Sequence, residues 1–346
     1  MLCLKRDANI GRKGERMKRS YYIYNNGSLR RKDNTLMFID ENDEKKNLPI
    51  EQINDIYIMS EMTFNTSLIN ILSQYGVSVH FFNYYSFYTG SFYPREKLVS
   101  GSLLIKQVEY YTDNEKRMEL ARKFIDGASY NIYRNLRYYN GRGKNVQAYM
   151  DVVEDLRKEI PKAQTIQELM GYEGNIRKTY YSAWPIIIDQ EIEFKKRVKN
   201  PPDNMVNTLI SFVNTMIYTK VLGEVYQTQL NPTISFLHEP GERRFSLSLD
   251  LAEIFKPILG DRLIFSLLNR NQITPKSFTK GLNYLHLTKN ASKIIAAELD
   301  TKMQTTIKHK ELKKSVSYQY LIRLECYKLV KHLLGEKEYE SFKIWW

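Results

Sequence analysis

Cysteine is almost absent from this chain of 346 residues, which has only Cys3 and Cys326. Two cysteines so far apart exclude a disulfide framework and any cysteine-based zinc site. The sequence has no run of about 18 apolar residues, so we expect no membrane span. Residues 1–16 lack the apolar core of a signal peptide, and we interpret them as an extension ahead of a more natural start at Met17. Together these absences predict a cytoplasmic protein.

Positive charge is plentiful by contrast. The 52 lysines and arginines against 39 acidic residues give a net charge of +13. This excess suits a polyanionic partner, and nucleic acid is the first expectation. Hydrophobic residues make up 42% of the chain and aromatic residues 13%, which is typical of a globular protein rather than a disordered one.

Two different patterns divide the chain and predict an α+β protein of two domains. Residues 17–98 contain short apolar segments separated by turn residues, which indicate a small β-rich amino-terminal domain. Residues 105–346 have helical spacing almost throughout, which predicts a larger, all-α-helical domain. We place the linker between them at residues 99–104.

Several features of the β-rich segment allow predictions. Asn25–Gly27, after the apolar Tyr21–Tyr24, predicts a hairpin turn, and Thr66–Tyr75 has the spacing of a helix. His80 has apolar neighbours, so we interpret it as a packed strand residue rather than a ligand. A dense aromatic group could stack on bases or pack in a core or dimer interface. Its members are Tyr84, Tyr85, Phe87, Tyr88, Phe92 and Tyr93.

The second domain is expected to begin with amphipathic helices, of which Glu115–Tyr139 is strongly basic. A basic helix is usually a solvated face, but the net charge makes contact with DNA the alternative. We also predict a strongly apolar helix over Asn204–Gln229, capped by Asp203. Further helices are predicted over residues 262–299 and 311–343.

The stretch from Asn231 to Pro257 combines turn residues, a histidine and the start of a predicted helix. Asp250 and Glu253 are three residues apart, which places both carboxylates on one face of that helix, near the loop of His238. An imidazole and two carboxylates are suitable ligands for a divalent metal ion. Alternatively, Asp250 is the N-cap of the helix and Glu253 completes a capping box. The spacing alone leaves both interpretations open.

A further carboxylate comes from the helix that the capping box Thr165–Glu168 opens. Glu173 falls in the middle of the apolar stripe of this helix, where a carboxylate is costly unless it is paired or bound to a metal. Its partner is either Arg177, one turn along the helix, or a metal ion shared with the His238 stretch.

These motifs together resemble the CRISPR-associated integrase family, the near-universal first Cas protein of spacer acquisition. The similarity runs from about Met17 to the carboxyl end, and residues 1–16 have no counterpart. The opening segment from Tyr21 is similar to type I members. The motifs are Glu173-Gly174, the loop of His238, and Arg244-Phe-Ser-Leu-Ser-Leu-Asp250-Leu-Ala-Glu253-Ile-Phe-Lys256-Pro257.

The resemblance implies a metal-dependent DNA endonuclease and integrase. By position in the motifs, the metal ligands would be Glu173, His238 and Glu253, and the ion would be Mg²⁺ or Mn²⁺. Asp250 would complete the catalytic set as a supporting acid. The positive side chains within the last motif, Arg244 and Lys256, are the expected DNA contacts.

The resemblance also implies partners. The protein partners are a second copy of the chain, with which it dimerises through the β-rich domain, and the small ferredoxin-like second Cas protein. The DNA partners are a protospacer duplex and the leader end of the CRISPR repeat, and no membrane is involved. Two alternatives stay open. One is a stand-alone, metal-dependent, structure-specific nuclease of DNA repair, with water as the nucleophile. The other is a non-catalytic DNA-binding scaffold whose acidic residues only cap helices and form ion pairs.

Overall fold

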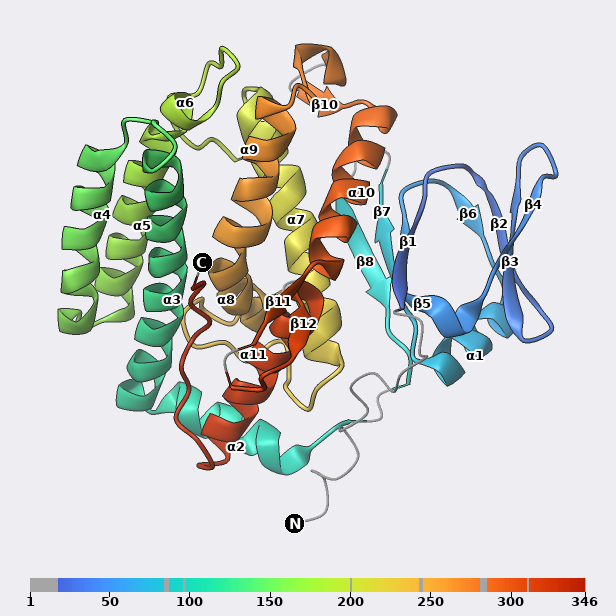
Figure 1. The fold of residues 1–346 in the computed structure, drawn as a ribbon. Coiled ribbons are helices and arrows are strands. Elements are labelled where there is room, and N and C mark those ends of the chain that lie inside the picture. The colour runs from blue at the N-terminus through green and yellow to red at the C-terminus, as the bar shows by residue number, and fades with distance from the viewer. Residues whose placement is uncertain are drawn as a thin grey trace. The chain divides into compact units, whose positions relative to one another are not determined.

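The chain forms two compact units in the computed structural model (Figure 1), the first ending at Glu96 and the second beginning at Lys97. A β-rich unit precedes a helical one, which confirms the predicted α+β class. The predicted extension, residues 1–16, lies outside the described residues. No helix within the described residues is long and apolar enough to cross a membrane. The structure describes residues 18–83, 87–95, 98–199, 201–242, 245–280, 285–309 and 311–345.

In its described residues the first unit has two four-stranded sheets, the α-helix α1 and a short 3-10 helix, η1 (Ile50–Gln52) (Figure 1). The strand order is β1-β5-β7-β8 in one sheet and β4-β3-β2-β6 in the other. Its apolar core includes fully buried leucine and isoleucine side chains from both sheets and from the helix. The elements are β1 (Arg19–Ile23), β2 (Gly27–Lys32), β3 (Thr35–Asp40), β4 (Lys45–Leu48), β5 (Ile53–Ile58), β6 (Met62–Thr63), α1 (Thr66–Tyr75), β7 (Ser78–Phe82) and β8 (Tyr88–Phe92).

The prediction of a hairpin at Asn25–Gly27 is wrong. Strand β1 pairs in parallel with β5, whereas β2 pairs with β3, so the turn carries the chain from one sheet to the other. Gly27 has a φ of +156°, and a Cβ atom on it would lie 2.1 Å from the carbonyl oxygen of Ile39. Gly27 therefore stands where two backbone segments come close together. The burial of apolar side chains such as Ile23 and Leu29, and not the turn, decides which strands pair.

The helix predicted over Thr66–Tyr75 is confirmed as α1. His80 is fully buried on β7, with its ring 4.9 Å from that of Tyr57, as expected for a packed strand residue. In the aromatic group, Tyr93 lies edge-on to His80, which favours packing over base stacking at that position. Tyr84 and Tyr85 lie outside the described residues.

The second unit is a helical bundle with two short antiparallel ribbons. Helix α3 packs against α4, α5 and α8, and α7 packs against α8 and α11 (Figure 1). The helices are α2 (Gly101–Thr112), α3 (Asn114–Asn140), α4 (Gln147–Glu159), α5 (Ile166–Ser182), α6 (Trp184–Ile187), α7 (Met205–Tyr226), α8 (Ser246–Phe255), α9 (Arg262–Asn269), α10 (Lys289–Gln304) and α11 (Tyr318–Leu333). The ribbons pair β9 (Phe278–Lys280) with β10 (Leu285–Leu287) and β11 (Thr306–Lys308) with β12 (Ser315–Ser317).

Several predicted helix boundaries differ from the structure. The ribbons interrupt the helices predicted over residues 262–299 and 311–343. Helix α7 is capped by Asn204 rather than Asp203, because the Asn204 side chain accepts the backbone N–H of Asn207. Helix α2 already begins within the predicted linker of residues 99–104, since the hydroxyl of Ser100 caps it at Leu103. The apolar α7 is buried around its circumference, which explains its lack of a polar face.

Candidate catalytic site

Helix α8 carries two of the predicted site residues and begins earlier than expected. It runs from Ser246, so Asp250 and Glu253 lie inside the helix and not in its first turn. The alternative in which Asp250 is an N-cap is therefore wrong. Arg244, predicted to contact DNA, lies outside the described residues.

The end of α8 is a π-helical turn, η3 (Lys256–Asp261), which leads into α9. Pro257 has no amide hydrogen and interrupts the regular hydrogen bonding of the helix, and single π turns of this kind occur often at functional sites. Two asparagines of α3 hold the segment: Asn131 donates to the carbonyl oxygen of Ile254 (2.9 Å) and Asn135 to that of Pro257 (2.7 Å). The helix that presents Glu253 is thus anchored to α3.

Asp250 organises the loop that carries His238. One carboxylate oxygen, Oδ2, accepts the backbone N–H groups of Phe236 (2.7 Å) and Leu237 (3.0 Å). The other, Oδ1, accepts the backbone N–H of His238 (2.9 Å) and its ring Nδ1–H (2.8 Å). Asp250 is fully buried, so these four donors replace the water that its carboxylate loses. Because Nδ1 carries the proton, Nε2 is the nitrogen that can bind a metal ion.

We expect Asp250→Asn to destabilise the protein. In asparagine an NH₂ group replaces one carboxylate oxygen, so two of the four N–H groups that Asp250 accepts lose their acceptor. Each buried N–H group without an acceptor costs about 1–3 kcal/mol. Urea unfolding should show a lower midpoint with an unchanged m-value. Asp155→Asn, on the exposed face of α4, is the matched control and should leave the midpoint nearly unchanged. A urea midpoint for Asp250→Asn equal to that of the wild type would contradict the role of Asp250 as the anchor of the His238 loop.

Arg177 forms ion pairs with two glutamates that lie far apart in the sequence, Glu173 and Glu253. Its Nε donates to Glu173 Oε1 at 2.6 Å, and its Nη2 donates to Glu253. Glu253 also accepts from Lys256 Nζ at 2.5 Å. The side chains of this cluster are only 10–20% exposed. Of the two partners predicted for Glu173, the structure shows Arg177, which also connects Glu173 to Glu253.

The protonation of the site follows from these contacts. Burial raises the pKa of Glu253, but the charges of Arg177 and Lys256 outweigh it and hold the pKa well below its usual value. Burial lowers the pKa of His238, but the hydrogen bond to Asp250 and the charges of Asp250 and Glu253 raise it above the usual value. Glu253 is therefore ionised at neutral pH.

Among the described residues, no three histidine, cysteine or acidic side chains lie close enough together to hold a metal ion directly. The physical reason is that Arg177 lies between the carboxylates of Glu173 and Glu253 and occupies the position of a cation. The donors themselves fit a divalent ion: two carboxylates already converge on one positive charge, and His238 offers Nε2. A metal ion bound to both carboxylates would require Arg177 to release them.

Lys256, predicted to contact DNA, is 13% exposed in its side chain and is paired with Glu253, so a DNA contact by Lys256 stays a prediction.

The sequence analysis missed Asp261 as a member of the site. Burial raises the pKa of Asp261 to about 7, partly opposed by Arg177. Its position on the same side of the predicted helix as Asp250 was the available signal, and the π turn changes that spacing.

Comparison with known proteins identifies the family of the chain. The family model of CRISPR associated protein Cas1 matches residues 21–301. A CRISPR-associated endonuclease Cas1 from Fusobacterium nucleatum subsp. nucleatum is 65% identical over 333 residues, covering 96% of this chain and 98% of that protein. Another from Thermodesulfovibrio yellowstonii is 48% identical over 328 residues, covering 95% of this chain and 100% of that protein.

A solved structure is also similar. The Cas1 protein from Thermotoga maritima superposes with a TM-score of 0.82 at 38% identity, covering 94% of this chain and 99% of that one. These matches confirm the resemblance drawn from the motifs, and the chain belongs to the Cas1 family of CRISPR-associated proteins.

Proposed function

We propose that this chain is a metal-dependent DNA integrase and endonuclease of CRISPR adaptation, which inserts protospacer DNA into the repeat array. The observation that carries the proposal is the convergence of Glu173 and Glu253 on one cation, Arg177. Beside it, Asp250 holds the ring of His238 with Nε2 left to bind a metal. The relatives in the comparison bear the name endonuclease, which supports phosphodiester chemistry.

Glu173, Glu253 and His238 would hold the ion, Mg²⁺ or Mn²⁺. When bound, a divalent ion polarises the phosphodiester and stabilises the charge that develops as a 3′-hydroxyl attacks. Asp250 keeps His238 in one tautomer and one orientation, which prevents the ring from turning its protonated nitrogen into the site. Arg177 and Lys256 bring two positive charges to the place where a DNA phosphate must enter, and so reduce its repulsion by the carboxylates.

We also propose the partners that the family implies. The chain would act in the cytoplasm as a homodimer, together with the small ferredoxin-like second Cas protein, on a protospacer duplex and the CRISPR repeat. The net charge of +13 supports a polyanionic partner.

The test is an integration assay in which a labelled duplex and a repeat-bearing plasmid are incubated with the protein and its second Cas partner. We expect covalent joining of label to plasmid in Mg²⁺ or Mn²⁺ and none with a chelator. Cleavage without joining would favour the stand-alone nuclease instead. DNA binding with neither reaction would favour the scaffold.

We expect the affinity for duplex DNA to fall steeply with salt. Each phosphate contact releases counterions, and a protein with about 6–10 such contacts loses roughly 10³–10⁵-fold in affinity between about 50 and 200 mM salt. Fluorescence anisotropy with a labelled duplex measures this slope, and a second duplex of scrambled sequence should bind about as well. An affinity independent of salt would count against DNA as the partner.

A further inference from the structure

Asp261 is a buried carboxylate outside the proposed set of metal ligands. It lies on the π turn η3 and is only 1% exposed. Its Oδ2 is buried and has no hydrogen-bond partner among the residues that the structure describes. The buried Asp250, by contrast, accepts four N–H groups. A buried polar atom without a partner is costly, so the open oxygen of Asp261 indicates a partner that it acquires in another state of the protein.

The side of η3 and α9 that carries Asp261 faces helix α5. Asn135 of α3 donates to the carbonyl oxygen of Pro257 (2.7 Å) and to the hydroxyl of Tyr180 on α5 (3.1 Å). The ring of Tyr180 also lies 6.4 Å from that of Phe265. Asp261 is four residues after Pro257 and four residues before Phe265, so it lies between the two residues that meet Tyr180, on the same side of the segment.

Arg177 lies on the same face of α5 as Tyr180, about one turn before it. Its positive charge lowers the pKa of Asp261, and the charge of Asp261 in turn raises the pKa of Arg177. Burial outweighs this attraction and leaves the pKa of Asp261 at about 7. Asp261 is therefore near Arg177, but the guanidinium is paired with the two glutamates instead.

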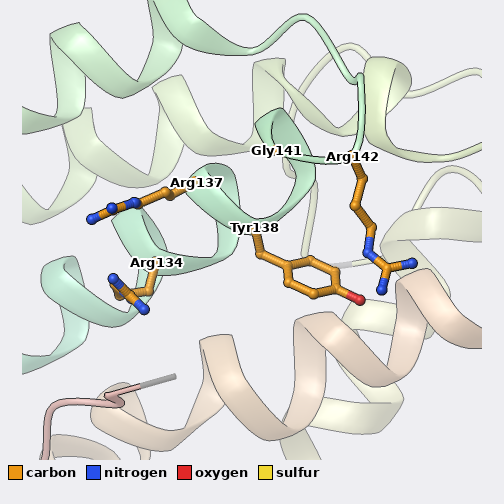
Figure 2. Close-up of a pocket in the computed structure, with 5 residues that line it drawn as sticks. All are labelled: Arg134, Arg137, Tyr138, Gly141 and Arg142. Atoms are coloured by element: carbon orange, nitrogen blue, oxygen red, sulfur yellow. The ribbon is translucent and has the colours of Figure 1, made fainter.

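Arg177 needs another carboxylate if it releases the two glutamates. Its side chain is 13% exposed, and a buried charge that loses its partner is strongly destabilising. Helix α3, which supports this part of the site, offers no acid, because residues 127–140 include neither aspartate nor glutamate. Its last turns instead present Arg134 and Arg137, which line a pocket of about 360 Å³ (Figure 2). Asp261 is thus the carboxylate available to Arg177.

We propose that Asp261 is a positioning residue that pairs with Arg177 when Glu173 and Glu253 bind the metal ion. The inference rests on the proposed function, because it takes these two glutamates as ligands. With the ion bound, the guanidinium turns from the glutamates to the open oxygen of Asp261, so that no charge is left unpaired in the interior. Asp261 thereby sets how tightly the site binds its ion without contacting the ion.

The test measures Mn²⁺ affinity without DNA, from the electron paramagnetic resonance signal of the free ion. We expect Asp261→Asn to bind Mn²⁺ at least about tenfold more weakly than the wild type, a loss within the range for groups of one ion-pair network. Without metal, urea unfolding should show the same variant to be at least as stable as the wild type, because a buried carboxylate without a full set of partners is removed. A carboxylate needed only for packing would lower the stability instead.

A second variant separates pairing with Arg177 from direct attraction between Asp261 and the ion. Arg177→Gln removes the cation that the metal must displace, so it should bind Mn²⁺ at least as tightly as the wild type, and weaker binding would overturn the proposal. In the Arg177→Gln background, Asp261→Asn should weaken binding by less than about threefold, because no guanidinium is left to pair. Equal losses in the two backgrounds would also overturn the proposal, since Asp261 would then act on the ion through its charge alone.

The control is Asp155→Asn on α4, where the side chain is 76% exposed, and it should change neither Mn²⁺ affinity nor stability. An unchanged Mn²⁺ affinity in Asp261→Asn would overturn the inference and leave the proposed function standing. If the wild type binds Mn²⁺ and Asp261→Asn binds it weakly, but the wild type never joins DNA in the integration assay, the proposed function fails and the inference stands. A wild type that binds no Mn²⁺ would overturn both.

Discussion

Alanine at Glu173, His238 or Glu253 should abolish strand transfer while leaving the fold intact. Each substitution removes one of the three donors that would hold the ion. Losing the several kcal/mol by which a metal stabilises the transition state amounts to about 10³-fold or more in rate. The integration assay measures the joined product, with circular dichroism and gel filtration as checks on the fold and the oligomeric state.

The structure makes these three variants informative in different ways. Glu253→Ala leaves Lys256 without its carboxylate partner, while Arg177 keeps its bond to Glu173. His238→Ala leaves Asp250 with its three backbone donors, so the loop should persist. Glu154→Ala, on the exposed face of α4, is the control and should retain full activity. A fully active His238→Ala protein would sink the assignment of the site.

We expect a divalent metal ion to raise the melting temperature of the wild type, and Glu173→Gln to remove this rise. At about 100 times its dissociation constant, a ligand that binds only the folded state stabilises it by about 2.7 kcal/mol. For a unit of this size that corresponds to a rise of about 5 °C or more in Tm. Mg²⁺ or Mn²⁺ should raise the Tm of the wild type but not that of Glu173→Gln, because glutamine lacks the negative charge that a hard cation needs.

Without metal the two proteins should melt almost alike. Glutamine keeps an oxygen that accepts from Arg177 Nε, and Arg177 keeps its ion pair with Glu253. Glu154→Gln should show the full metal-induced rise and serves as the control. Equal rises in wild type and Glu173→Gln would remove Glu173 from the site. They would also show that the ion pair with Arg177 is the whole role of this carboxylate.

The structure confirms one of the two sequence interpretations of Glu173, its ion pair with Arg177, while its binding of a metal ion stays a prediction. The i,i+4 spacing of Glu173 and Arg177 on α5 correctly indicated an ion pair. The same spacing could not indicate that Arg177 also reaches Glu253, 76 residues further along the chain. That contact depends on how α5 and α8 both pack against α3, and no local pattern encodes it.

The sequence by itself determined the features that depend on near neighbours. Alternating apolar residues and turn residues marked the β-rich part. Helical spacing marked the second part, and the run from His238 to Glu253 marked the candidate site, because secondary structure and short motifs depend on residues close together in the chain. The predicted helix over Thr66–Tyr75 has the same bounds in the structure for that reason.

Only the tertiary structure decided the features that depend on burial and long-range packing. It separated β1 and β2 into different sheets, although a turn of hairpin type joins them, because each strand pairs where its apolar side chains are buried. It began α8 at Ser246 and made Asp250 the buried anchor of the His238 loop rather than a helix cap. It also brought Arg177 between two glutamates from different helices. A buried charge must find a partner, and which partner it finds depends on which helices pack together.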